Sequence, residues 1–170
     1  MQIETLDADG ALTLFPDLVA LLRDSVDHGA SVGFLPPLAD AEAHAYWDKA
    51  ISDLAAGERV LVVALDDGRV VGGGQLALEA RPNGRHRADI QKVLVRTDYR
   101  RRGIAQTLML ALEDAARAHQ RSLLVLDTVQ GGDAERLYAR LGYTRAGVIP
   151  DFALNGDGGR DATVVFYKLL

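Results

Sequence analysis

Two kinds of hydrophobic repeat alternate along the chain, and together they predict a mixed α/β fold. Apolar residues at helical spacing predict four helices, at about 16–27, about 40–56, 103 to about 119, and about 133–140. Runs of apolar and β-branched residues predict seven strands, at 2–7, 59–65, 69–79, about 87–95, 122–128, 143–147 and 162–170. The order β-α-α-β-β-β-α-β-α-β-β indicates the α/β class, with a mixed sheet and helices on both faces.

Composition places the chain among ordinary globular proteins. With 170 residues, 48% hydrophobic and 25% charged, and no linker or repeat, residues 1–170 are expected to form a single domain. The absence of cysteine excludes disulfides, thiolate catalysis and Cys-ligated zinc, and the four histidines lack metal-ligand spacing, so no metal is expected. Because no signal-like segment or long apolar stretch occurs, we expect a cytoplasmic protein with no membrane partner.

The charge is unevenly distributed. The chain carries a net charge of −5, but residues 85–102 contain seven Lys and Arg against two Asp, a net +5. A basic segment in an acidic protein favours a small polyanion as ligand, because the remaining surface would repel a nucleic-acid backbone. A solvated charged face is the simpler alternative.

The segment 93–108, VLVRTDYRRRGIAQTL, combines an apolar run, a basic turn with a glycine, and the start of an amphipathic helix. A helix start of this kind offers unpaired N–H groups to an anion, and the helix dipole favours negative charge there. Arg100, Arg101 and Arg102 are unfavourable beside that dipole unless an anion is bound. We therefore predict an anion site at this turn.

Three motifs in this order resemble those of the GNAT N-acetyltransferases. Residues 100–105, RRRGIA, resemble the family's acetyl-CoA pyrophosphate loop. The strand 122–128 stands where the family's next parallel strand splays away, and 134–143 is similar to the signature A-x-x-x-Y-x-x-x-G-F/Y. The resemblance implies a GNAT-type sheet of about seven strands with a splayed parallel pair. It also implies an acetyltransferase that uses acetyl-CoA as cosubstrate and a primary amine as acceptor, by direct attack in a ternary complex.

The same resemblance implies which residues hold the cofactor. The strand edge at 93–95 would pair with the pantetheine arm, and a backbone N–H near Val93 or Leu94 would face the thioester oxygen. The turn would anchor the pyrophosphate through its N–H groups, and a Cβ at Gly103 would crowd the phosphate. The predicted cofactor-binding residues are Val93, Leu94, Val95, Arg100, Arg101, Arg102, Gly103, Ile104, Ala105 and Gln106.

Three side chains are predicted to be catalytic. Tyr138, at the signature position, is the candidate general acid for the departing thiolate, with a packing role as the alternative. Asp89, in the middle of a strand, and Asp127, at a strand end, are candidates for the general base, with a bridging water favoured for Asp89. Asp127 and Gln91 are also predicted to contact the substrate, although a strand-end Asp can equally cap the following loop.

The sequence defines the acceptor amine less closely than the cofactor. Segments 28–34, 81–92 and 126–131 resemble a family member that acetylates a β-lactam amino acid, which suggests an amino-acid-like or antibiotic-like amine and a role in toxin resistance. The carboxylate of such a substrate would need a cation, for which Arg85, Arg87 and Lys92 are candidates.

The sequence also allows other functions. The chain could acetylate protein or peptide amines, or bind acyl-CoA without catalysis. A dinucleotide-binding oxidoreductase is disfavoured, because the turn at Gly103 lacks the fingerprint G-x-G-x-x-G and Gly72, Gly73 and Gly74 precede a strand-like alternation. The sequence allows a monomer or a homodimer.

Overall fold

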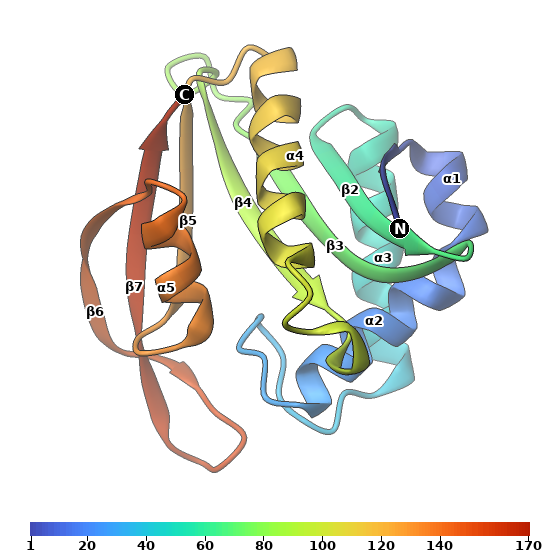
Figure 1. Cartoon of the computed structure of the whole chain (residues 1–170), viewed down its shortest axis with the longest axis horizontal. Coiled ribbons are helices and arrows are strands. Elements are labelled where there is room, and N and C mark those ends of the chain that lie inside the picture. Colours follow the sequence, from blue (N-terminus) through green and yellow to red (C-terminus); the bar gives the residue numbers. More distant parts are fainter.

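The computed structural model describes residues 1–170, arranged as one mixed sheet between two layers of helices (Figure 1). The helices are α1 (Ala8–Thr13), α2 (Phe15–Asp27), α3 (Asp40–Ala55), α4 (Ile104–Ala118) and α5 (Asp133–Arg140), with a short 3-10 helix at Thr97–Tyr99. The strands are β1 (Gln2–Leu6), β2 (Arg59–Asp66), β3 (Arg69–Leu78), β4 (Arg87–Val95), β5 (Leu123–Val129), β6 (Thr144–Leu154) and β7 (Arg160–Leu169).

The sheet order is β1-β2-β3-β4-β5-β7-β6, and β4–β5 is the one parallel pair. Helices α4 and α5 cover one face, and α1, α2 and α3 cover the other (Figure 1). The predicted seven-stranded mixed sheet with helices on both faces is therefore confirmed. No helix has the length and apolar character needed to cross a bilayer.

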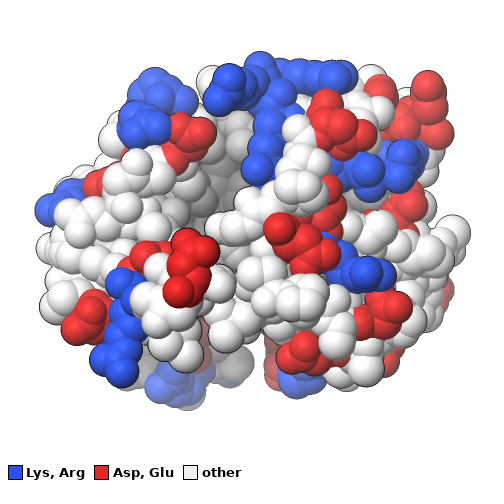
Figure 2. Space-filling model, turned by 90° about the horizontal axis from the view of Figure 1, so that it is seen from below, with Lys and Arg blue, Asp and Glu red and all other residues white.

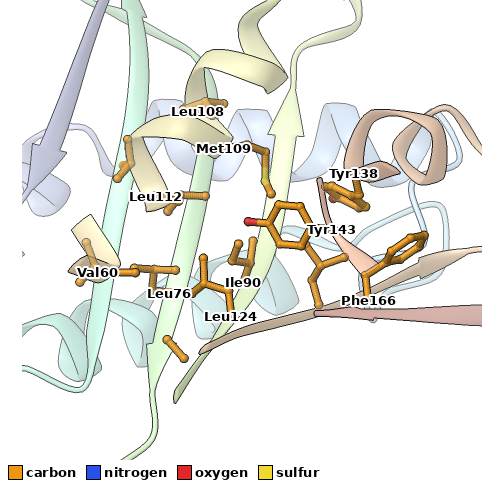
Figure 3. Packing of buried hydrophobic residues seen from close by; sticks show 14 of the residues in the cluster. Val60, Leu76, Ile90, Leu108, Met109, Leu112, Leu124, Tyr138, Tyr143 and Phe166 are labelled. Atoms are coloured by element: carbon orange, nitrogen blue, oxygen red, sulfur yellow. The ribbon is translucent and has the colours of Figure 1, made fainter. Parts of the chain in front are cut away.

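Strand alternation divides the core into two clusters. Along β2, Val60 and Val62 pack toward α4, whereas Leu61 and Val63 pack toward the opposite helices. Because both faces of β2 are covered, its sequence is a nearly continuous apolar run. Figure 3 shows the α4 side, where the helix lies on the sheet through Leu108, Met109 and Leu112.

Two of the three glycines in β3, Gly72 and Gly74, allow α4 to lie close to the sheet. A Cβ at Gly74 would be 2.8 Å from Cδ1 of Leu112, and one at Gly72 would be 3.1 Å from Cγ2 of Ile104. These residues lie inside a strand and not in a phosphate-binding turn, as the sequence analysis expected. Their role is close helix–sheet packing.

A bulge in β4 determines which side chains reach the site. Gln91 pairs with Gln75 and Leu94 pairs with Gly73, so Lys92 and Val93 together oppose a single residue of β3. Lys92 has φ of 51°, the left-handed conformation that allows the bulge. The extra residue reverses which side chains of β4 point to each face of the sheet. Ile90, before the bulge, packs in the α4 cluster, and Leu94, four positions later and after the bulge, packs in the opposite cluster.

Two parts of the fold differ from the expected elements. Helix α1 was not predicted; it begins after Asp7, whose side chain accepts a hydrogen bond from the Gly10 N–H at 2.8 Å. Strand β6 was expected to end at residue 147, but it continues through Pro150 to Leu154. It lies at the edge of the sheet, where proline is tolerated because one side of the strand needs no ladder hydrogen bonds.

Candidate active site

The parallel strands β4 and β5 pair over a short stretch and then separate. Only three residues of each strand pair: Arg87–Asp89 of β4 lie opposite Leu123–Val125 of β5. From Ile90 onward one edge of β4 has no neighbouring strand, so its backbone groups on that side are free for a ligand. Figure 1 shows the strands diverging, and Figure 2, which views the open end, shows a hollow with basic side chains along its rim. This is the splayed parallel pair that the sequence analysis expected.

A first cleft of about 680 Å³ runs between α4 and α5 and is called the cofactor cleft below. All of the predicted cofactor-binding residues except Arg102 line it. Helix α5 supplies the opposite wall, including Arg136 and Arg140, so basic side chains stand on both sides. Its volume is within the range of small-molecule sites.

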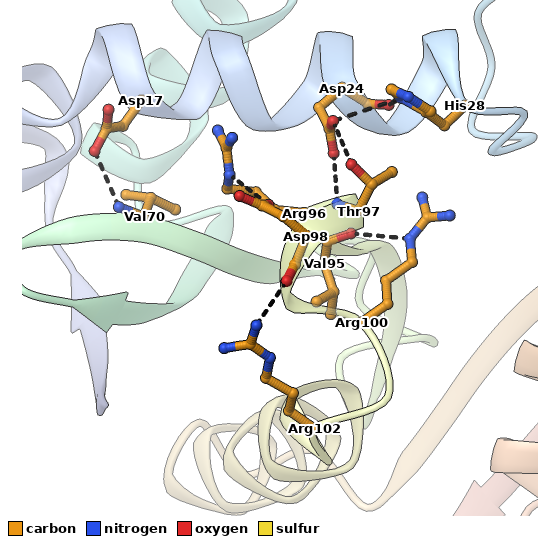
Figure 4. Close-up of polar contacts among 10 residues, drawn as sticks. All are labelled: Asp17, Asp24, His28, Val70, Val95, Arg96, Thr97, Asp98, Arg100 and Arg102. Atoms are coloured by element: carbon orange, nitrogen blue, oxygen red, sulfur yellow. Dashed lines mark hydrogen bonds and ion pairs between the residues drawn. The ribbon is translucent and has the colours of Figure 1, made fainter.

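The turn before α4 is held in place by polar contacts, shown in Figure 4. Asp24 of α2 accepts hydrogen bonds from the N–H and the hydroxyl of Thr97, both at 2.8 Å. Arg100 donates from Nε to the Val95 carbonyl at 3.3 Å, and Arg102 donates to the Asp98 carbonyl at 2.9 Å. The guanidinium of Arg102 also lies 4.7 Å from the centre of the Tyr99 ring. The side chain of Arg102 is thus engaged within its own turn, and Arg102 does not line the cofactor cleft.

The start of α4 has the features of an anion site. No side chain caps the helix, and its first turn holds no acidic residue. No protein group accepts a hydrogen bond from the N–H groups of residues 101–106. Gly103 has φ of 80°, and a Cβ there would meet no atom within 4 Å. Within the protein alone, the glycine is therefore required by its backbone conformation, and the expected crowding of a phosphate stays a prediction.

A second cleft of about 720 Å³ opens on the other side of β4 and is called the acceptor cleft below. Its walls are the loop 28–33, the bulge of β4, the end of β5, and the hairpin between β6 and β7. The residues that line both clefts include Val93 of β4 and Tyr138 of α5. The two clefts therefore meet beside the strand edge where the thioester was expected.

Tyr138 stands at this junction with a free hydroxyl. The residue is 7% exposed, and its ring lies 6.0 Å from that of Tyr143 and 6.1 Å from that of Phe166. Figure 3 shows the three side chains together in the α4 cluster. No protein group forms a hydrogen bond with its hydroxyl. Burial, with a further contribution from the charge of Asp127, raises the pKa of Tyr138 to about 12. The phenol therefore keeps its proton at any physiological pH and can donate it.

The two candidate general bases, Asp127 and Asp89, lie in different parts of the structure. Asp127 lines the acceptor cleft, and its Oδ2 accepts a hydrogen bond from the Thr163 hydroxyl at 2.7 Å. Asp89 lies in the closed part of the parallel pair, opposite Val125, and lines neither cleft. Asp89 precedes Val93 by four positions of strand, each with a rise of about 3.3 Å. Burial raises the pKa of Asp89, but its position leaves only a route through water.

The bulge brings a further residue into the acceptor cleft. Lys92 lies beside the predicted substrate residue Gln91, and both line the cleft. Its ammonium lies 5.3 Å from the centre of the Tyr46 ring and 5.8 Å from that of Phe34. From the sequence alone, Lys92 was only one of three candidate partners for a substrate carboxylate. The consecutive polar pair Gln-Lys, which breaks the strand alternation, was the signal for its position.

A buried network supports this wall of the acceptor cleft. Gln75, which is 1% exposed, accepts hydrogen bonds from the Tyr46 hydroxyl at 2.9 Å and from Arg59 at 2.6 Å. Arg59 also pairs with Asp53 at 3.1 Å. The network fixes the ring of Tyr46 and brings a second cation near the ammonium of Lys92. Sequence reasoning had no signal for it, because its members come from α3, β2 and β3.

Residues 24–143 match the model of the Acetyltransferase (GNAT) family. The chain belongs to the GNAT acetyltransferase family. The predicted family is thus confirmed, and the acyltransferase class is confirmed at the level of the family.

Individual relatives agree with this assignment. An N-acetyltransferase from Azospirillum brasilense, encoded in the hisH-hisA intergenic region, is 34% identical over 113 residues. That match spans 65% of this chain and 66% of the relative, so the chain covers about two thirds of the relative's length.

Solved GNAT structures share the whole fold. A ribosomal-protein-alanine N-acetyltransferase from Brucella melitensis has a TM-score of 0.81 at 21% identity, with both chains covered completely. The acetyltransferase yncA from Salmonella typhimurium, solved with its cofactor acetyl-CoA, has a TM-score of 0.80 at 18% identity, covering 100% of this chain and 94% of its own. At these identities the likeness establishes the fold and not the acceptor.

Proposed function

We propose that this protein transfers an acetyl group from acetyl-CoA to a primary amine of a small molecule. The observation that carries the proposal is the meeting of the two clefts at Val93 and Tyr138. One cleft ends at an uncapped, basic helix start suited to a pyrophosphate, and the other contains carboxylates suited to an amine. Acetyl-CoA bound to yncA of the same fold supports the choice of cofactor.

The reaction follows from this arrangement. A neutral amine in the acceptor cleft attacks the thioester carbonyl, and the oxygen that becomes negative accepts a hydrogen bond from the free backbone edge near Val93 or Leu94. The C–S bond then breaks, and the sulfur leaves with its electron pair. The amine then loses a proton, which passes through water to Asp127, and the thiolate accepts a hydrogen bond from the hydroxyl of Tyr138. Bringing both substrates together is itself worth roughly 7–11 kcal/mol.

The pKa of Tyr138 refines its proposed role. A phenol with a pKa of about 12 is a weaker acid than a thiol with a pKa of ~8.5, so complete proton transfer to the sulfur is uphill. The hydroxyl contributes most as a hydrogen-bond donor that stabilises charge as it develops on sulfur. Water can complete the protonation afterwards.

A small acceptor is favoured over a protein because the acceptor cleft has walls on two sides. The loop 28–33 closes one side and residues of the β6–β7 hairpin, among them Phe152 and Thr163, close the other. The resemblance of 28–34, 81–92 and 126–131 to the tabtoxin resistance protein supports an amino-acid-like or β-lactam amine and a role in resistance. The likeness to the ribosomal-protein-alanine enzyme keeps peptide N-termini as the second candidate.

The cofactor assignment is tested by calorimetric titration with acetyl-CoA, with NAD as the control ligand. Saturable binding of acetyl-CoA and none of NAD is the expected result. Failure to bind acetyl-CoA would overturn the proposed function. Binding without thiol release in the presence of any amine would instead identify a non-catalytic acyl-CoA module. A cytoplasmic location, a single domain over residues 1–170, and a monomer or homodimer stay predictions.

A further inference from the structure

The acceptor cleft contains a cation that no protein group neutralises. Lys92 lines the cleft, and its ammonium forms neither a hydrogen bond nor an ion pair with the protein. The rings of Phe34 and Tyr46, which meet edge to face at 5.6 Å, hold the ammonium in place. Desolvating a charge is costly unless a partner is found. An anionic group on a ligand would be such a partner.

The same cleft contains a carboxylate without a cationic partner. Asp127 accepts one hydrogen bond, from Thr163, and forms no ion pair. The other two carboxylates of the cleft are differently engaged: Asp133 pairs with Arg136, and Asp161 accepts a hydrogen bond from Asn155 at 3.0 Å. Asp127 and Lys92 attract one another but are too far apart to form an ion pair. The space between the two charges is therefore bordered by an anion on one side and a cation on the other.

The other cations considered for this role are excluded by their positions. Arg87 pairs with Glu79 at 2.7 Å, and Arg85 donates to the Ala80 carbonyl; neither lines the cleft. Arg100 lies at the junction with the cofactor cleft, and its Nε is bound to the Val95 carbonyl. Lys92 is one residue before Val93, so it lies next to the expected position of the thioester. A substrate held by Lys92 is thus held beside the reacting carbon.

We infer that the acceptor is a zwitterion of the free amino-acid type, with its carboxylate on Lys92 and its amine toward Asp127 and the thioester. This inference rests on the proposed function and narrows its substrate class. It excludes polyamines and aminoglycosides, which lack a carboxylate, and internal lysines of proteins. A charge-assisted hydrogen bond to the carboxylate is expected to favour the amino acid by roughly 10- to 100-fold over an amine without that group.

The test uses matched acceptors that differ only at the carboxylate. L-Methionine and L-phenylalanine are compared with their amides and with 3-(methylthio)propylamine and phenethylamine, and spermidine represents polycations. Acetyl transfer is measured by thiol release over a range of concentrations. The expected result is a kcat/KM at least 10-fold higher for an amino acid than for its amide or its amine. Equal or higher values for the amides, the amines or spermidine would overturn the inference.

Variants of Lys92 test whether this residue causes the preference for an acceptor with a carboxylate. Lys92→Met should raise the KM of the amino acid by roughly 10- to 100-fold and the KM of the matching amine much less, so that the preference for the carboxylate is lost. Lys92→Arg should retain part of the preference. Arg85→Met, which removes an equal charge outside the cleft, is the control. An equal loss for amino acids and amines in Lys92→Met would contradict the assignment. If the protein binds acetyl-CoA but acetylates no amino acid, only the inference of a zwitterionic acceptor is refuted. If it does not bind acetyl-CoA, the proposed function itself is refuted.

Discussion

Replacing Tyr138 with phenylalanine removes a single hydroxyl from the junction of the two clefts. The ring contacts with Tyr143 and Phe166 remain, and the hydroxyl has no hydrogen-bond partner to lose. The free energy of unfolding should therefore change by less than about 1 kcal/mol. General acid catalysis is worth roughly 10²- to 10⁴-fold in rate. Because the pKa of about 12 makes this phenol a weak acid, we expect a loss in kcat near the lower end of that range.

The chain offers a matched control for this substitution. Tyr143→Phe makes the same chemical change 6.0 Å away, at a buried ring that lines neither cleft. Steady-state thiol release should show kcat reduced only in Tyr138→Phe, while calorimetry shows acetyl-CoA bound with unchanged affinity by both variants. Full turnover in Tyr138→Phe would refute the role given to this hydroxyl. An equal loss in both variants would show that the effect is one of packing.

Three further predictions concern the anion site, the core and the pH profile. Gly103→Glu should abolish acetyl-CoA binding in a calorimetric titration, whereas Gly57→Glu, at a glycine that also has positive φ and open space, should bind normally; binding by the first variant would place the anion site elsewhere. Lys168→Met should lower the free energy of unfolding by about 3 kcal/mol in denaturant titrations, because it removes the cation at 2.8 Å from the buried carboxylate of Glu113 and leaves only the half-exposed guanidinium of Arg117 at 3.9 Å; adding Glu113→Gln should restore part of the loss, and no recovery would refute the pairing argument. Because the pKa of Tyr138 is raised to about 12, kcat should rise as the acceptor amine deprotonates and should not fall up to pH 10; a decline near pH 9 would mean that the donor is another group.

Much of the fold could be predicted because the hydrophobic pattern of most helices and strands matches the way they pack in the structure. The apolar run of β2 and the alternating residues of β4 have bounds close to those expected, 59–65 and 87–95. Helix α1 was missed because its six residues include a glycine and contribute a single buried residue, Ala11. The continuation of β6 was missed because proline argues against a strand, and only its place at the sheet edge makes Pro150 acceptable.

The two clefts differ in how far the sequence could describe them. The cofactor cleft is built mainly from one continuous segment, β4 to the start of α4, so its residues could be predicted together; of those predicted, Arg102 is the one that does not line it. The acceptor cleft joins a loop near residue 30, the bulge at Lys92 and the ends of β5 and β7. Nothing local relates these segments, and a bulge changes the facing of every residue after it. This is why the sequence did not distinguish Lys92 from Arg85 and Arg87 as the cation of the acceptor cleft.

Mixing the protein with acetyl-CoA, first alone and then with an acceptor amine, tests direct transfer between the two clefts most simply. Free thiol and the mass of the protein are followed in both cases, together with the acetylated amine. Direct attack predicts no thiol release and no acetylated protein without the amine, and equal amounts of thiol and acetylated amine with it. A burst of thiol from acetyl-CoA alone, matched by one acetyl group gained by the protein, would contradict the account.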